Sequence, residues 1–146
     1  MFKHILIATD GSEASDHAAA LAVSMARIHG SRITAIFVVD PYPFLGIGET
    51  NPMGFQAYMS AALDHAADAH SKVEALCVSG NEKINLQVRV VEGVTAAHGI
   101  VQTAKDELAD LIVLGSHGRS GIRRLMLGSV ANKVVAESTI PVLVTR

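Results

Sequence analysis

The sequence predicts an α/β protein built on an open, parallel, five-stranded sheet with helices on both faces. Five apolar, β-branched segments alternate along the chain with four segments of helical periodicity, which is the pattern of repeated strand–helix–strand units. The chain has 146 residues, of which 49% are hydrophobic, and this is enough for one domain with its own core. We therefore expect a single domain over residues 1–146.

The first strand is predicted over His4–Thr9, and the first helix follows from Ser12. Ser12 suits the N-cap position, and two carboxylates follow it in the first turn, where they interact favourably with the helix dipole. Gly30 can adopt the left-handed conformation that ends a helix. The helical spacing predicts a buried stripe made of Ala18, Leu21, Ala22, Met25 and Ile28.

The second strand is predicted over Ile33–Val39 and the second helix over about Gln56–Val78. Between them, Asp40–Pro52 contains three prolines and two glycines, so we expect a loop there. The inward side chains of the second helix are predicted to be Met59, Leu63, Ala66, Val73 and Cys77.

The third strand, Ile84–Val91, differs from the others because its apolar and polar residues alternate. By contrast, Leu111–Leu114 is apolar on both faces, as a central parallel strand should be. The third strand is central in the order 2-1-3-4-5 and lies at an edge in the order 3-2-1-4-5. The alternation favours the second, Rossmann-like order.

The remaining elements complete the alternation of strands and helices. A third helix is predicted over about Thr95–Leu108, a fourth over Ser129–Glu137, and a closing strand over Pro141–Val144. The inward residues of the third helix are predicted to be Ala97, Ile100, Val101, Ala104 and Leu108.

The composition excludes several classes of function. Twelve lysines and arginines against fourteen acidic residues give a net charge of −2, which argues against nucleic-acid binding through phosphate neutralisation. The single cysteine, Cys77, excludes an internal disulfide and the classical zinc patterns. The longest apolar runs are a few residues, far short of the roughly 20 that span a membrane. We expect a cytoplasmic protein without nucleic-acid or membrane partners.

The predicted strand order selects two loops as the candidate site. In open α/β sheets, ligands bind at the carboxyl ends of the strands where the strand order reverses. In the order 3-2-1-4-5 this point lies between the first and fourth strands. The loops that emerge there are Thr9–Ser12 and Gly115–Gly128.

The second of these loops has the composition of a phosphate site. Its four glycines allow backbone N–H groups to converge, and Gly128-Ser129 opens a helix whose positive dipole end favours an anion. It also carries three positive charges and no carboxylate, from Arg119, Arg123 and Arg124. The alternative is a flexible connection with solvated arginines. No Gly-Lys-Ser/Thr motif and no dinucleotide fingerprint is present, which excludes P-loop NTPase and NAD-binding functions.

The spacing of these glycines resembles a known family motif. Gly115 and Gly118 are followed after nine residues by Gly128-Ser129, which matches the G-x2-G-x9-G-[S/T] motif of the universal stress protein family. The opening Ile5–Ser12 and the closing Pro141–Val144 also resemble that family. The resemblance covers the whole chain.

The resemblance implies ATP binding and a set of site residues. Asp10 is expected near the ribose and phosphates or a bound divalent metal, and Val38 or its neighbour Val39 is expected to pack on adenine. The full set of expected nucleotide-binding residues is Ala8, Thr9, Asp10, Val38, Val39, Gly115, Ser116, His117, Gly118, Arg119, Gly128, Ser129 and Val130.

Two of these residues have alternative interpretations. Asp10 could act only as a turn or helix-capping residue, and His117 either approaches phosphates or is a solvent-exposed loop histidine. A carboxylate near a triphosphate repels it unless a cation intervenes. We therefore expect a weak Mg²⁺ or Mn²⁺ site in which Asp10 acts together with the ATP.

The resulting hypothesis is a cytoplasmic ATP-binding stress-response protein that regulates a still unspecified protein partner as a nucleotide-dependent homodimer. The family tendency and the unpaired edge of the last strand place the dimer contact at Val142–Thr145. The alternative is a slow ATP hydrolase or nucleotidyl-transferring enzyme on the same fold, in which Asp10 and His117 are the candidate groups beside the γ-phosphate. Any hydrolysis is expected to be absent or very slow. A nucleotide-free dimerisation module is the third alternative, and the intact motif argues against it.

Overall fold

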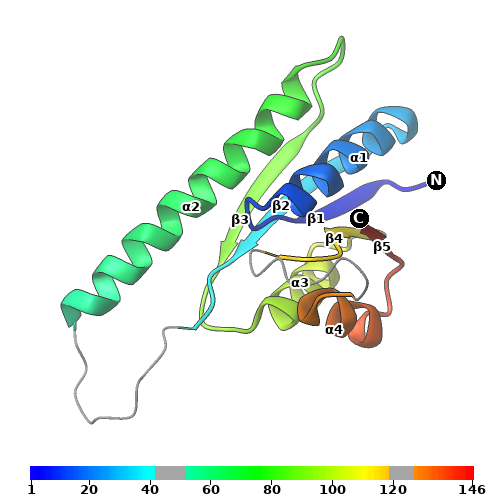
Figure 1. The fold of residues 1–146 in the computed structure, drawn as a ribbon. Helices are drawn as coiled ribbons and strands as arrows, with labels where there is room; N and C mark the ends of the chain where they lie inside the picture. The colour runs from blue at the N-terminus through cyan, green and yellow to red at the C-terminus, as the bar shows by residue number, and fades with distance from the viewer. Residues whose placement is uncertain (42–51, 119–126) are drawn as a thin grey trace.

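A computed structural model of the protein describes residues 1–41, 52–118 and 127–146. Strands and helices alternate from end to end of the chain (Figure 1). The elements are β1 (His4–Ala8), α1 (Glu13–His29), β2 (Arg32–Val38), α2 (Pro52–Val78), β3 (Leu86–Val91), α3 (Ala96–Asp106), β4 (Leu111–Gly115), α4 (Ser129–Glu137) and β5 (Val142–Thr145).

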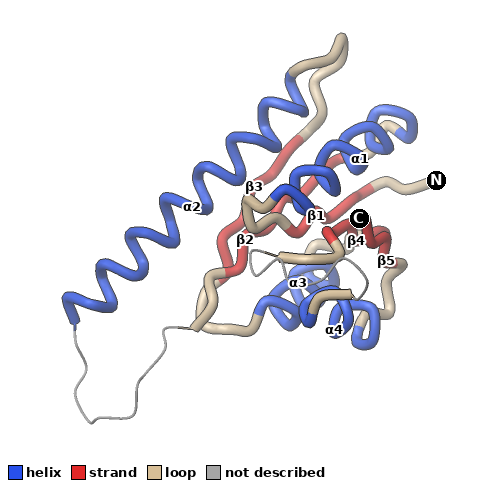
Figure 2. The backbone as a smooth tube through the Cα atoms, viewed as in Figure 1, coloured by secondary structure: helices blue, strands red, loops and turns tan. Residues whose placement is uncertain are grey.

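The five strands form one parallel sheet in the order β3-β2-β1-β4-β5. This confirms the fold class and the strand order, including the edge position of the third strand. The sheet lies between two helical layers, with α1 and α2 on one side and α3 and α4 on the other (Figure 2). Alternate residues of each central strand contribute to the two layers, so that Ile5 and Ile7 pack beneath α1 whereas Leu6 packs beneath α3 and α4.

Local capping chemistry sets the ends of α1. The Ser12 hydroxyl accepts a hydrogen bond from the Ser15 N–H at 3.3 Å, and Gly30 ends the helix with φ 66°. Both roles are those predicted from the sequence. A glycine suits this position because a side chain disfavours the left-handed region.

The predicted buried face of α1 was partly wrong. Leu21 and Ile28 are 42% and 79% exposed, whereas the buried face consists of Ser15, Ala18, Ala19, Ala22, Val23 and Ala26. Small residues line this face because α1 lies very close to the sheet, where Gly115 of β4 meets the backbone of Ala14.

Two further burial predictions, for Leu63 and Leu108, differ from the structure, and the edge strand is more exposed than the central ones. Leu63 of α2 is 45% exposed, and Leu108 lies beyond the end of α3, 81% exposed and with φ 55°. On β3, Val88 and Val90 are 49% and 39% exposed, since this strand is at the edge of the sheet and α2 covers it incompletely. Val73 and Cys77 are buried as expected.

Candidate functional site

A cleft of about 520 Å³ opens at the carboxyl ends of β1, β2 and β4. The first turns of α3 and α4 form one wall, and the N-terminal half of α2 forms another. This volume is within the roughly 300–1,000 Å³ that is usual for small-molecule sites. The cleft includes the point where the strand order reverses, as the rule for open α/β sheets predicts.

The loop after β1 fixes the carboxylate of Asp10. Asp10 Oδ1 accepts a hydrogen bond from the Ser12 N–H at 2.9 Å, so the residue does serve in the turn that starts α1. Thr9 makes two hydrogen bonds. Its N–H donates to the Ile36 carbonyl at 3.0 Å, and its hydroxyl lies 3.3 Å from Ser15 Oγ. Asp10 remains partly exposed and lines the cleft. The carboxylate of Asp10 therefore both stabilises this turn and faces the cleft.

The connection from β4 to α4 is closed by main-chain hydrogen bonds. Ser116 N–H donates to the Thr145 carbonyl of β5 at 2.7 Å, and Gly128 N–H donates back to the Ser116 carbonyl at 2.6 Å. Gly128 is the N-cap of α4 and, having no side chain, makes no cap hydrogen bond of its own. The first turn of α4, with the amides of Ser129, Val130 and Ala131, lies at the wall of the cleft. Amides in the first turn have no partner within the helix.

Three glycines allow close approaches around the cleft: Gly118 and Gly128 within the loops, and Gly115 between β4 and α1. A Cβ on Gly118 would lie 2.8 Å from Asp10 Oδ2, and one on Gly128 would lie 2.9 Å from the Ser116 carbonyl oxygen. Gly115 has the same function deeper in the fold, where a Cβ would lie 2.8 Å from the backbone of Ala14. Real Cβ atoms essentially never make contacts below 3.0 Å; the Asp10 carboxylate is the end of a side chain and can shift, whereas the backbone neighbours of Gly128 and Gly115 cannot do so cheaply. Asp10 and the glycine loop thus face each other across the switch point, as the sequence predicted.

His117 has an orienting partner. Its Nδ1 lies 2.9 Å from the Ser116 hydroxyl, and its ring is partly buried at the edge of the cleft. Apart from the adjacency of the two residues, no sequence pattern predicted this pair.

The floor of the cleft is apolar. It is formed by side chains from the face of the sheet that α3 and α4 cover, together with the starts of these helices: Ala8, Ile36, Val38, Ala96, Ile100, Leu114 and Ala131. Val38 and Val39 point to opposite faces, and the Val39 side chain is 2% exposed beneath α2. Of the two valines expected to pack on adenine, it is therefore Val38 whose side chain contributes to this floor.

The main chain of β2 also faces the cleft where β1 has ended. The β1–β2 ladder ends at Ile36, which accepts the hydrogen bond from Thr9 N–H, whereas β2 continues to Val38. Successive residues of a strand bond to opposite neighbours, and Val39 N–H donates to the Val91 carbonyl of β3 at 2.8 Å. The N–H and C=O of Val38 are therefore directed toward the β1 side, beyond the last paired residues.

All but one of the residues predicted for the site line the cleft. They are Ala8, Thr9, Asp10, Val38, Val39, Gly115, Ser116, His117, Gly118, Gly128, Ser129 and Val130. Arg119 lies outside the described residues, as do the other two arginines of the loop, Arg123 and Arg124. That these residues bind a nucleotide stays a prediction.

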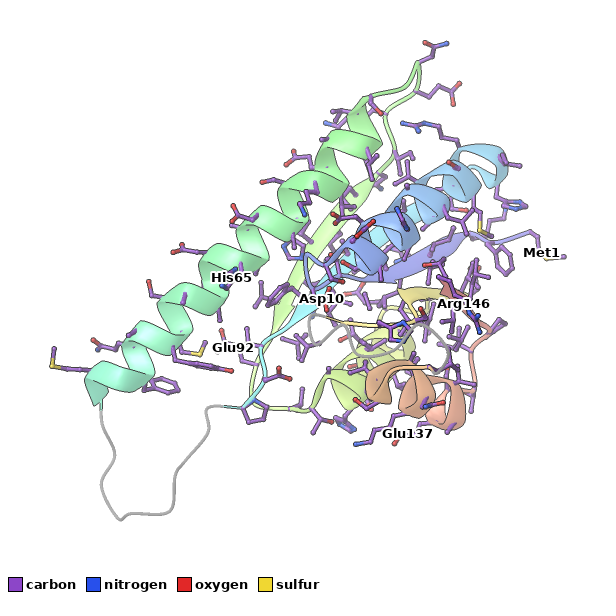
Figure 3. All side chains as sticks on the ribbon, in the orientation of Figure 1. Met1, Asp10, His65, Glu92, Glu137 and Arg146 are labelled. Atoms are coloured by element: carbon purple, nitrogen blue, oxygen red, sulfur yellow. The ribbon has the colours of Figure 1, made fainter. Side chains whose placement is uncertain are left out.

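The sequence missed the wall that α2 contributes. Tyr58, Ala62 and His65 line the cleft, and the Tyr58 hydroxyl donates to the Asp40 carbonyl at 2.7 Å. Figure 3 shows His65 on the stretch of α2 that passes the end of β1, where Asp10 lies. No local motif marks these residues, since their place depends on how α2 returns across the sheet. The one relevant feature of the sequence was that Asp40 follows the second strand at the same edge of the sheet.

Two buried histidines lie outside the cleft. His4, at the opposite end of the sheet, lies 2.8 Å from Thr34 Oγ1 through Nε2 and 3.0 Å from the Glu107 carbonyl through Nδ1. His70 of α2 is also buried. Burial lowers the pKa of both rings, and Arg32 lowers the pKa of His4 further. Within the described part of the chain, no three His, Cys, Asp or Glu side chains are grouped to hold a metal ion.

Comparison with known proteins identifies the family. The sequence profile of the Universal stress protein family matches residues 1–146. The chain belongs to this family. A universal stress protein of Thermus aquaticus is 38% identical over the full length of both chains, and one of Methanocaldococcus jannaschii is 35% identical over all of this chain and 83% of its own length.

Solved structures agree with this assignment. The universal stress protein UspA from Lactobacillus plantarum superposes with a TM-score of 0.83 at 29% identity, covering 99% of this chain and 97% of that one. Two more distant structures contain nucleotides. One is a universal stress protein in complex with cAMP, with 23% identity, a TM-score of 0.66 and coverage of 99% of this chain and 97% of that one. The other, from Archaeoglobus fulgidus in complex with dAMP, has 19% identity, a TM-score of 0.61 and coverage of 100% and 98%.

Because the sequence identities of the cAMP and dAMP complexes to this chain are low, these two similarities show a shared fold only.

Among the helices that the structure describes, none combines the length and apolar character that crossing a bilayer requires.

Proposed function

We propose that this universal stress protein is a cytoplasmic, ATP-binding regulatory protein that acts as a homodimer. The observation that carries the proposal is the start of α4, which opens onto the cleft and has at its N-cap a glycine, Gly128, that has no side chain to cap the helix. Exposed amides and the positive end of a helix dipole favour a phosphate group at this position. An apolar floor for a base lies in the same cleft. The cAMP and dAMP complexes of structurally similar proteins support a nucleotide as the class of ligand.

The geometry suggests how ATP would lie. Its phosphates would accept hydrogen bonds from the first-turn amides of α4 and from the Ser129 hydroxyl, while the base occupies the apolar floor beside Val38. The N–H and C=O of Val38 form a donor and acceptor pair directed into the cleft, which suits the N1 and N6 edge of adenine. Asp10, between these two ends, would approach the ribose and the phosphates.

A divalent cation fits this arrangement only together with the nucleotide. Asp10 supplies a carboxylate at the cleft, and no three-residue cluster for a metal exists among the described residues. Mg²⁺ usually combines one or two carboxylates with substrate phosphates and water, and Asp10 fits that pattern. The cation would neutralise phosphate charge beside the carboxylate.

The proposed dimer uses β5. This strand is the outer neighbour of β4, and its four residues are only half-buried within one chain. Pairing with the same strand of a second copy across a two-fold axis would satisfy its outer backbone groups.

The first experiment is to denature the protein purified from cells and to identify any released nucleotide by chromatography. The emptied protein is then titrated with ATP in a calorimeter, with and without Mg²⁺. We expect ATP to be released or to rebind in the micromolar range, and Ser129→Ala to weaken binding whereas Ser79→Ala, at the far end of α2, does not. An emptied protein that takes up no ATP would contradict the proposal.

A slow ATP hydrolase is the second candidate, favoured by the contact between His117 Nδ1 and the Ser116 hydroxyl. Efficient hydrolysis needs a group that positions water at the γ-phosphate, and an oriented imidazole beside the phosphate wall could do this. Phosphate release that follows enzyme concentration and disappears in Asp10→Ala and His117→Ala would establish turnover. Release at the background rate in the unmodified protein would exclude it.

A further inference from the structure

Gly99 occupies an unusual position in the interior of α3. It is buried, and its N–H donates to the Thr95 carbonyl at 2.9 Å in the first turn of the helix. Glycine is the least favourable helix residue after proline. Its φ is not positive, so the backbone conformation alone does not require glycine here. The reason must lie in what its missing side chain makes room for.

The side chain that occupies this room is Val38. A Cβ on Gly99 would lie 3.1 Å and 3.3 Å from the two γ-methyl carbons of Val38, and 3.2 Å from a γ-methyl of Val94. These distances are tighter than nine in ten real Cβ contacts, so a methyl group at position 99 requires both Val38 and Val94 to give by a few tenths of an ångström. Val38 is the valine that lines the floor of the cleft.

Val38 has room to move only toward the cleft. On its own face of the sheet Val38 packs among the buried residues of α3 and β2, including Ile36 and Ile100. Interiors are packed at crystal-like density, so the side chain has little room in that direction. Two residues of the same helix, Ala96 one turn before Gly99 and Ile100 directly after it, line the same floor.

We propose that Gly99 is a positioning residue that keeps Val38 withdrawn against α3 and thereby gives the cleft the width of a flat purine base. This inference rests on the proposed nucleotide-binding function. Gly99 does not itself line the cleft and acts through Val38.

The test is a double-mutant cycle read by ATP titration. Gly99→Ala is expected to displace Val38 toward the part of the cleft proposed for the adenine base. One misplaced methyl in an apolar pocket costs about tenfold or more in affinity. Val38→Ala alone costs a few-fold, because it removes contact without obstructing the floor. The double variant Gly99→Ala/Val38→Ala is expected to bind ATP more tightly than Gly99→Ala alone, since the obstruction is gone. The control is His98→Ala on the exposed side of α3, which should bind as the unmodified protein does.

The outcomes separate this inference from the function on which it rests. If the unmodified protein binds no ATP, the proposed function fails. If it binds and Gly99→Ala binds equally well, only the present inference is overturned. A double variant that binds no better than Gly99→Ala also overturns it, because the loss then does not pass through Val38. An equal loss in His98→Ala overturns it as well, because the effect would then be general to α3.

Discussion

Replacing Gly128 by alanine tests whether the start of α4 holds the phosphates. Gly128 has φ −62° and ψ 162°, a conformation open to alanine, so the substitution introduces no backbone strain of its own. The added Cβ would lie 2.9 Å from the Ser116 carbonyl oxygen, the same atom that accepts the Gly128 N–H at 2.6 Å. Both groups belong to the main chain, so the conflict cannot be relieved by a side-chain rotation.

The structure gives the size of the expected effect. Ordinary contact begins at 3.4 Å, so the start of α4 must move by about 0.5 Å relative to Ser116. Overpacking of this kind costs about 1 kcal/mol in stability at its lower end, or about 2–4 °C in Tm for a chain of this length. Ligand-holding groups tolerate displacements of about 0.5 Å or less, so we expect ATP affinity to fall on the order of tenfold, about 1.4 kcal/mol.

Calorimetric titration of ATP and a thermal melt measure the two effects separately. Gly80→Ala is the matched control, because a Cβ there also meets atoms at 2.7–2.9 Å, but they belong to the exposed guanidinium group of Arg27, which can swing away. It should leave ATP affinity unchanged. Wild-type affinity in Gly128→Ala, with the expected small loss of Tm, would refute the phosphate assignment of α4.

Three further results are expected. Gly115→Ala should destabilise the fold by about 1–3 kcal/mol in urea unfolding, because its Cβ would enter the backbone of α1. The free energy of unfolding should have its full value above the ordinary histidine pKa of about 6.5 and should fall as the pH drops below it. The reason is that burial lowers the pKa of His4 and His70 in the folded protein, so the unfolded chain binds more protons at low pH. The slope per histidine cannot exceed about 1.4 kcal/mol per pH unit, and a urea midpoint equal at pH 7.5 and 5.5 would contradict this. Val144→Pro should produce monomers in light scattering, since Pro141 and Thr145 bond to β4 and Val144 therefore turns its N–H outward. An unchanged dimer would show that β5 is not the interface.

Much of the fold was accessible from the sequence because its signals are local. The Ser12 cap, the Gly30 end of α1 and the bounds of α4 depend on neighbouring residues only, and the structure has them as predicted. The alternating pattern of the third strand was enough to choose the strand order. The buried face of α1 was not accessible, because the prediction favoured large apolar residues such as Leu21, whereas the close approach at Gly115 admits only small ones.

The site could be predicted as far as it follows from strand order and the glycine motif. Both loops lie where the topology places them, and Val38 follows from the end of the second strand. The α2 wall with Tyr58 and His65 could not be found, because it depends on the path of the chain between β2 and α2 and on tertiary packing. The restraint that Gly99 places on Val38 joins two segments about 60 residues apart and has no sequence signature either.

The two candidate functions differ in which atoms they require. Binding, as the geometry supports it, depends chiefly on main-chain groups: the first-turn amides of α4 and the N–H and C=O of Val38. Hydrolysis depends on side chains, the Asp10 carboxylate and the His117 ring that Ser116 orients. Substitutions that move the backbone should therefore weaken both properties, whereas His117→Ala should stop turnover and leave ATP bound. A protein whose ATP affinity depends on Gly128 and whose phosphate release stays at the background rate would be a nucleotide sensor and not an enzyme.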